Sequence, residues 1–197
     1  MIEREDLLNI LKIILNKDNI ILEDLDKIED LTLNKYKLNN SPNDIDLKEL
    51  NLFKNLKTLT LINFNIRSKD IEAINKNKNL WAVQFSKCIF EDAIPINTGV
   101  KYLIIHYCKE IKYELINNNR TTRIIGATVD LDLIKQTNQI ERLFLQNCDI
   151  KNERTLLNYT QLKYLNIDGS RINSDILNNL DKNIQISYKT EYHPEEG

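Results

Sequence analysis

The chain has 197 residues, of which 27 are basic and 29 are acidic, and its net charge is −2. This near balance provides no bulk basic field for nucleic acid and no strongly acidic field for a basic partner. The 29 isoleucines and 28 leucines fill 57 positions, whereas only 4 glycines are present to build phosphate-binding loops. A hydrophobic share of 42% supports one folded domain and excludes a chain that is disordered by composition.

Targeting and redox signals favour an intracellular protein. The first six residues carry three acids and one base, unlike the positive start of a secretory signal. No run of about 18 apolar residues is present, so we expect no membrane span. Three cysteines, Cys88, Cys108 and Cys148, form an odd set that does not complete a disulfide framework. These features predict a cytoplasmic protein with reduced cysteines.

The first expected element is an amphipathic helix over residues 4–17. Its apolar side chains recur at helical spacing, at Leu7, Leu8, Leu11, Ile14 and Leu15. It has too few basic residues for a helix that lies on an anionic bilayer. We therefore predict that residues 1–27 form a capping helix and an entry segment, because a stacked array of repeats must cover its exposed end.

From residue 28 onward the chain repeats the pattern apolar-x-x-apolar-x-apolar. The copies, of which the fifth is the weakest and the eighth only partial, begin at Ile28, Leu56, Leu80, Val100, Thr121, Ile140, Leu162 and Ile184. Their spacing averages about 22 residues, a period typical of solenoid proteins. The second and third apolar residues of each copy alternate as in a half-buried strand. One copy cannot bury its own apolar face, so neighbouring copies must stack.

A further inward position follows three residues after the last apolar residue of each copy. Its occupants are Tyr36, Phe64, Cys88, Cys108, Val129, Cys148 and Ser170. All three cysteines fall on this one position, although they were not used to set the alignment. The unit resembles the leucine-rich repeat, LxxLxLxx(N/C)xL, over roughly residues 28–188. Glu110, Thr121 and Gly126 depart from the motif, so whether residues 110–126 form a regular turn stays open.

The resemblance implies an α/β solenoid. It would be a right-handed superhelix of about seven leucine-rich repeats with a concave parallel β-sheet, spanning residues 28–188 and followed by a polar tail over 189–197. Two return segments, at residues 68–74 and 174–180, read as single helical turns. We expect Ser68 and Ser174 to cap them.

Candidate catalytic and metal-binding residues are few. His106 and Cys108 suggest a Cys–His pair, but strand alternation points His106 outward and returns Cys108 inward. The cysteines are separated by 20 and 40 residues, which matches stacked repeats rather than a short metal-binding pattern. We therefore expect buried cysteines, no catalytic residues, no metal and no cofactor.

The concave sheet face is where a solenoid most often binds its partners. In the predicted register, Ile104, Ile125 and Phe144 form an exposed apolar strip at the middle of that face. Tyr102, Arg123, Arg142 and Tyr164 run on one side of the strip, and His106 and Tyr107 lie on the other. The predicted binding surface comprises Trp81, Tyr102, Ile104, His106, Tyr107, Arg123, Ile125, Arg142, Phe144 and Tyr164.

The composition of this surface favours a non-enzymatic module that binds an unidentified protein. Aromatic residues, arginine and a contiguous apolar patch are typical of binding hot spots. One competing interpretation is that β-branched and aromatic residues simply suit strands. Two other functions are a homo-oligomeric scaffold and a weak polyanion or nucleic-acid binder through Arg123 and Arg142. The net charge and the nearby Glu141 disfavour nucleic acid, and the sequence does not predict the oligomeric state.

Overall fold

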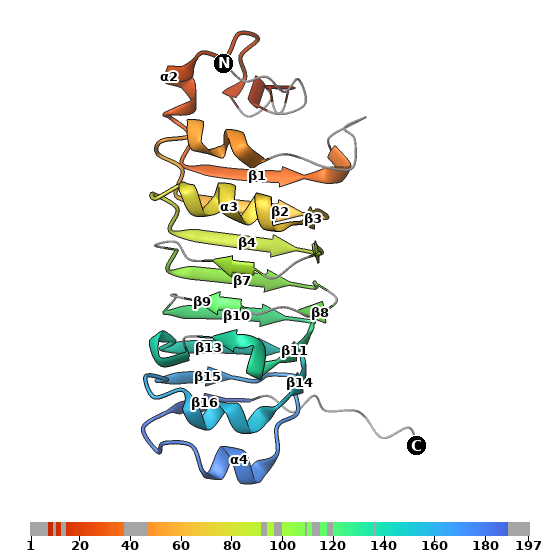
Figure 1. Cartoon of the computed structure of the whole chain (residues 1–197), viewed down its shortest axis with the longest axis vertical. Coiled ribbons are helices and arrows are strands. Elements are labelled where there is room, and N and C mark those ends of the chain that lie inside the picture. The colour runs from red at the N-terminus through yellow and green to blue at the C-terminus, as the bar shows by residue number, and fades with distance from the viewer. Residues whose placement is uncertain are drawn as a thin grey trace.

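The computed structural model describes residues 8–9, 11–12, 15–37, 47–91, 94–96, 100–108, 110–111, 115–117, 120–135 and 137–188. Figure 1 shows a single stack of turns in which the strands follow one another in chain order. The main sheet contains β1 (Asp30–Asn34), β2 (Thr58–Ile62), β4 (Ala82–Ser86), β7 (Tyr102–His106), β10 (Thr121–Ile125), β13 (Arg142–Gln146), β15 (Tyr164–Asn166) and β16 (Gln185–Ser187). All neighbouring pairs are parallel, which confirms the predicted solenoid of seven copies and a partial eighth.

Short elements form the other sides of each turn. Small parallel sheets join β3 (Asn65–Ile66) with β5 (Ile89–Phe90), β8 (Glu110–Ile111) with β11 (Thr128–Asp130) and β14 (Asp149–Lys151), and β6 (Ile94–Ile96) with β9 (Leu115–Asn117) and β12 (Ile134–Lys135). The helical segments are α2 (Leu22–Leu25), η1 (Lys35–Lys37), η2 (Leu47–Leu52), α3 (Ser68–Lys76), η3 (Leu131–Leu133), η4 (Thr137–Gln139), η5 (Glu153–Asn158) and α4 (Ser174–Asn178). One continuous core of leucine, isoleucine and phenylalanine lies between them and the main sheet.

A left-handed corner ends most strands of the main sheet. The corner residues, with φ between 51° and 69°, are Asn63, Lys87, Tyr107, Gly126, Asn147 and Gly169. Glycine and asparagine fill four of these six positions because other L-residues adopt this conformation at a cost of about 1–2 kcal/mol. The corner residues from Asn63 to Asn147 still donate their N–H groups to the neighbouring turn. The Tyr107 N–H, for example, donates to the Ile125 carbonyl at 2.7 Å. The corner turns the next residue into the core.

The inward residues after these corners are Phe64, Cys88, Cys108, Ala127, Cys148 and Ser170. Tyr36, which was predicted to take the same position in the first copy, is instead 78% exposed. All three cysteines are buried and free, which confirms their predicted place. The Cys88 thiol donates to the Leu61 carbonyl at 3.3 Å, and the Cys148 thiol donates to the Ile124 carbonyl at 3.4 Å. Burial raises the pKa of the Cys148 thiol, so it stays protonated and able to donate. The thiols thus link each turn to the one before it.

The predicted register is wrong by two residues in the fifth strand. Thr122 pairs with Leu103 and Ile124 pairs with Ile105, so the inward residues are Thr122 and Ile124 rather than Ile124 and Gly126. The cause is Thr122, a polar residue that is fully buried where the motif requires an apolar one. Gly126 is therefore a corner and not a departure from the motif.

Two neighbouring predictions change with this correction. The inward residue of the fifth turn is Ala127 rather than Val129, because Val129 lies in β11 opposite Ile111 and Ile150. Glu110 was one of the departures from the motif, at its last apolar position. The structure places Ile111 at that position instead, opposite Val129. The last strand is also shifted, by one residue, because Ile186 rather than Ser187 pairs with Leu165.

The predicted serine caps are wrong. Arg67 precedes the nine-residue helix α3, and its N–H donates to the Asp70 carboxylate at 3.0 Å. At α4 the side chain of Asn173 accepts the N–H of Asp175 at 2.8 Å. Both helices therefore begin with the predicted serine as their first helical residue, one position after the cap, and α3 is longer than a single turn.

The N-terminal end of the stack is covered by helical backbone at residues 8–9, 11–12 and 15. Leu11 is fully buried and Leu15 packs against the same core as the repeats. Leu7, Ile14 and the tail over residues 189–197 lie outside the described residues. None of the described helices has the length and apolarity needed to span a bilayer.

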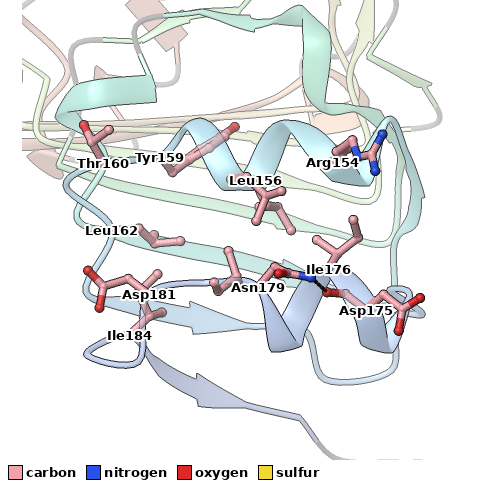
Figure 2. A pocket seen from close by; sticks show the side chains of 12 residues that line it. Arg154, Leu156, Tyr159, Thr160, Leu162, Asp175, Ile176, Asn179, Asp181 and Ile184 are labelled. Atoms are coloured by element: carbon pink, nitrogen blue, oxygen red, sulfur yellow. Dashed lines mark hydrogen bonds between the residues drawn. The ribbon is translucent and has the colours of Figure 1, made fainter.

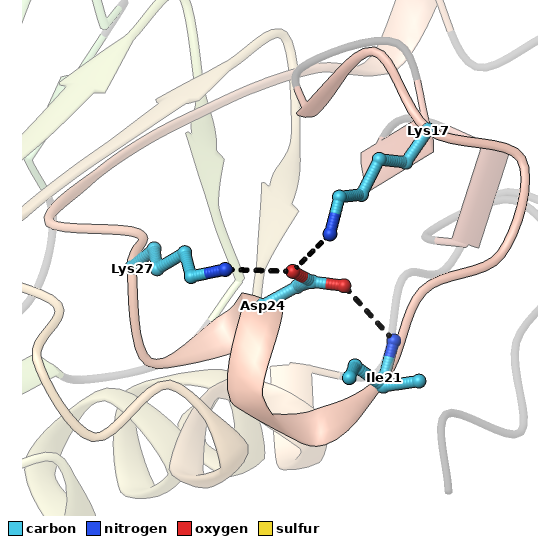
Figure 3. A network of polar contacts seen from close by, with 4 residues as sticks. All are labelled: Lys17, Ile21, Asp24 and Lys27. Carbon is cyan, nitrogen blue, oxygen red and sulfur yellow. Dashed lines mark hydrogen bonds and ion pairs between the residues drawn. The ribbon is translucent and has the colours of Figure 1, made fainter.

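Asp24 ties this end of the chain together (Figure 3). Its buried carboxylate accepts hydrogen bonds from Lys17 at 2.6 Å and Lys27 at 3.1 Å, and from the Ile21 N–H at 3.3 Å. The hydrogen bonds from Lys17 and Lys27 lower the pKa of Asp24 to about 2. Because this value lies below that of an unfolded aspartate, about 3.9, the charged form stabilises the fold.

We expect Asp24→Asn to lower the melting temperature at neutral pH. The stabilisation is fully present above about pH 4 and disappears as the pH falls toward 2, so the difference between wild type and variant should shrink over that range. Thermal denaturation followed by circular dichroism between pH 7 and pH 2 measures this difference. Asp18→Asn, a change at an exposed aspartate, is the control and should leave the melting temperature unchanged. A pH-independent difference would contradict the role of the charge.

Candidate functional site

The open sheet face is the solvent side of the eight-stranded sheet. It carries three rows of side chains, because alternate residues of a strand point to the same side. The entry row is Asp30, Thr58, Ala82, Tyr102, Thr121, Arg142, Tyr164 and Gln185. The central row is Thr32, Thr60, Gln84, Ile104, Arg123, Phe144, Asn166 and Ser187. The exit row of the middle strands is Ser86, His106, Ile125 and Gln146.

The predicted apolar strip of Ile104, Ile125 and Phe144 is wrong in its arrangement. Arg123 lies between Ile104 and Phe144 in the central row. Ile125 lies one row away, paired with His106 on one side and Gln146 on the other. A shift of two residues keeps each side chain on the same face but moves it along the strand by one row. All three side chains therefore lie on the predicted face of the sheet, in a different order, but Phe144 is buried there rather than exposed.

Arg123, Arg142, Phe144 and Tyr164 form the arginine–aromatic cluster. The Arg123 Cζ lies 4.5 Å from the Phe144 ring centroid. The Arg142 Cζ lies 5.7 Å from the Phe144 centroid and 5.3 Å from the Tyr164 centroid. The two rings are 5.2 Å apart, and Phe144 is only 9% exposed. Within the described residues, neither guanidinium has an ion pair or a hydrogen bond, so their N–H groups remain available to a ligand.

A second set of aromatic side chains borders the cluster. Trp81 is 46% exposed, and its ring centroid lies 4.5 Å from that of Tyr102. Tyr107 is 51% exposed, and its ring centroid lies 4.4 Å from that of His106. The Tyr107 ring also lies over Gly126, where an added Cβ would be 2.4 Å from Tyr107 Cδ1. The sequence thus identified both groups, although their contacts depend on ring orientations that a repeat motif does not determine.

Ion pairs occupy several of the charged residues that immediately precede the strands. Lys57 contacts Glu29 at 2.7 Å. Glu141 contacts both Lys163 at 3.1 Å and Arg120 at 3.8 Å. Lys163, which immediately precedes β15, is thus paired with a carboxylate. The guanidinium groups of Arg123 and Arg142 take part in none of these ion pairs.

The side chains of His106 and Cys108 do not form a catalytic pair. Cys108 is completely buried and its thiol faces the Phe85 carbonyl at 3.7 Å, whereas His106 stacks on Tyr107 at the surface. In the described part of the chain, no group of three or more histidine, cysteine, aspartate or glutamate side chains is placed to hold a metal ion.

A cavity of about 620 Å³ that the sequence did not reveal lies between η5 and α4 (Figure 2). Leu156, Leu162, Ile176 and Ile184 provide apolar parts of its wall. Asn179 lies at the same opening and donates to the Asp175 carbonyl at 2.7 Å. The cavity lies between two short return segments. The way these segments pack against each other leaves no repeating pattern in the sequence.

Comparison with known proteins supports the fold. No family model and no curated protein match the sequence. Among solved structures, the chain is similar to internalin C2 from Listeria monocytogenes, with a TM-score of 0.52 and 15% identity over 94% of this chain and 93% of that one. It is also similar to an internalin (inlF) from the same organism, with a TM-score of 0.54 and 15% identity over 95% of this chain and 64% of that one. The predicted fold class, a leucine-rich repeat solenoid with a concave parallel sheet, is thereby confirmed.

Proposed function

We propose that this chain is a non-enzymatic protein-interaction module that binds a protein partner through the open sheet face. The observation that carries the proposal is the concentration of arginine and aromatic side chains over the strands from β7 to β15, with Trp81 at the start of β4 beside them. The first two strands carry threonine and aspartate in the equivalent rows, and the Thr58 hydroxyl is hydrogen-bonded to Asp30. Strand propensity alone would spread aromatic side chains over the whole sheet.

The energetics of protein recognition support this assignment. Tryptophan, tyrosine and arginine dominate binding hot spots. The two aromatic residues bury large areas with few rotatable bonds, and arginine contributes a planar group with several N–H donors. Here Tyr102, Arg123, Arg142 and Tyr164 project from strands whose backbones are fixed by ladders on both sides, and Trp81 immediately precedes β4. Little conformational entropy is therefore lost when a partner covers them.

The test is capture of proteins by the full chain from the cells that produce it. We expect Arg142→Ala and Phe144→Ala to reduce capture of the specific partner by about tenfold or more, as truncation of a hot-spot residue does. Arg171→Ala and Ile89→Ala change exposed residues outside the open sheet face and are the matched controls. Circular dichroism melting verifies that each variant is folded, and Arg142→Ala decides the test if Phe144→Ala is destabilised.

Two results would contradict the proposal. One is a partner that is captured equally by Arg142→Ala and by the controls. The other is a concentration-dependent dimer, seen by light scattering, that both face substitutions dissociate, because this would assign the same surface to self-association.

A further inference from the structure

We propose that the segment recognised by the open sheet face is acidic, with aspartate or glutamate carboxylates bound by Arg123 and Arg142. This inference rests on the proposed function and specifies the chemistry of the partner. Its basis is the arginine–aromatic cluster, in which two guanidinium groups contact rings and have no anionic partner among the described residues.

Both arginine Cζ atoms lie over aromatic rings, at 4.5–5.7 Å from the ring centroids, and this placement favours a planar anion as the ligand. A guanidinium that lies over an aromatic ring uses its face for the ring and directs its N–H groups outward in its own plane. Those N–H groups match the two oxygens of a carboxylate. Arg123 and Arg142 occupy diagonal positions on adjacent strands, which places their backbones about 7–8 Å apart. One acidic segment can therefore reach both arginines.

The surrounding charges leave the middle of the face positive. Asp30 belongs to β1, four strands from Arg123, which is about 19 Å at the usual strand spacing and beyond the range of screened charges. Asp168 keeps its charge, accepts a hydrogen bond from the Asn166 amide at 2.9 Å, and follows the end of β15, two strands from Arg123. Glu141 faces Arg120 and Lys163 in the column that precedes the strands. A chain with a net charge of −2 thus presents a local cationic centre on this face.

The apolar neighbours of the cluster indicate a second feature of the partner. Ile104 lies directly beside Arg123 in the central row. Tyr102, on the same strand as Ile104, packs against Trp81 with the two rings tilted. Tyr102 and Arg142 are two strands apart in the entry row, which is about 10 Å, or about three residues of extended peptide. We therefore expect an aromatic or aliphatic residue about three or four positions from the acidic residues.

The same geometry disfavours single-stranded nucleic acid. Bases stack on exposed aromatic faces, but the ring that both arginines contact, Phe144, is only 9% exposed. The exposed Trp81 ring packs against Tyr102 and not against either arginine. A phosphate backbone also needs a continuous track of cations. Lys57, Arg120 and Lys163 do not provide that track, because each is paired with a glutamate.

The test is a selection of displayed random peptides of about 12 residues, long enough to cross the middle strands at about 3.3 Å per residue. Peptides are selected on the wild-type chain and measured by fluorescence anisotropy on wild type, on Arg123→Gln/Arg142→Gln and on the Arg171→Gln control. We expect enriched acidic residues near an aromatic or aliphatic one. Binding to the double variant should fall by about tenfold or more, because charge-assisted hydrogen bonds are lost. Arg123→Glu/Arg142→Glu should select basic peptides instead.

The outcomes separate this inference from the proposed function. Peptides that lack acidic residues, or that bind the double glutamine variant as tightly as wild type, would overturn the acidic partner. If such peptides still lost binding in Tyr102→Ala, the proposed binding face would stand. Failure to enrich any peptide that depends on this face would count against both. Tighter, salt-dependent binding of oligothymidylate than of any selected peptide would reassign the arginines to nucleic acid.

Discussion

Replacement of Phe85 by alanine is expected to lower the free energy of unfolding by about 3–5 kcal/mol, the usual loss for a fully buried phenylalanine. Phe85 is 0% exposed in β4, and its ring meets the edge of Phe90 with centroids 5.2 Å apart. Each turn of a solenoid is stabilised by its two neighbours, so a cavity in β4 weakens the contacts with both β2 and β7. Urea unfolding followed by circular dichroism gives the difference.

Phe85→Leu is the matched variant because it keeps most of the buried apolar volume. We expect it to lose clearly less stability than Phe85→Ala. A loss below about 1 kcal/mol for the alanine variant would mean that neighbouring side chains collapse into the cavity, contrary to the close packing of this core.

Gly126→Ala is expected to lower the free energy of unfolding by about 2–4 kcal/mol, through two separate effects. The corner has φ of +64°, which is unfavourable for any residue with a Cβ. The new Cβ would also lie 2.4 Å from Cδ1 of Tyr107 and displace that ring. Denaturant unfolding measures the total, and a double-mutant cycle with Tyr107→Ala separates the two parts.

The cycle makes the physical account testable. In the Tyr107→Ala background, Gly126→Ala should cost only the backbone part, about 1–2 kcal/mol. Lys87→Gly changes an equivalent corner, with φ of +53°, in the opposite direction and should not destabilise the chain, because glycine tolerates this conformation. Additive effects of Gly126→Ala and Tyr107→Ala would show that the ring does not contribute.

The sequence predicted the arrangement of most turns because buried apolar residues recur with the period of the strand. The centres of six strands, at residues 32, 60, 84, 104, 144 and 166, were in the correct register. The fifth strand was misaligned because a motif written in apolar residues has no place for the buried Thr122. The helix caps were missed for a related reason: Ser68 and Ser174 are good capping residues, but Arg67 and Asn173 occupy the capping positions.

The candidate site was predictable in composition and not in arrangement. Strand alternation identified which side chains lie on the open sheet face, and these include Ile104, Arg123 and Phe144, but it did not predict that Phe144 is buried there. Which of these side chains touch depends on the strand register and on ring orientation. The sequence therefore did not predict that Arg123 lies over the Phe144 ring. The cavity between η5 and α4 has no sequence signal, because it results from how two short segments pack.

The buried thiols have a consequence for measuring motion in this chain. Cys88 and Cys108 lie in the third and fourth turns and Cys148 lies in the sixth, each sealed inside its turn. A thiol reacts with an alkylating reagent only when it is exposed and ionised, so each cysteine reports the opening of the turn that contains it. Alkylation rates, resolved by mass spectrometry of the three peptides, would therefore give the opening equilibrium at three heights of the stack without any introduced probe.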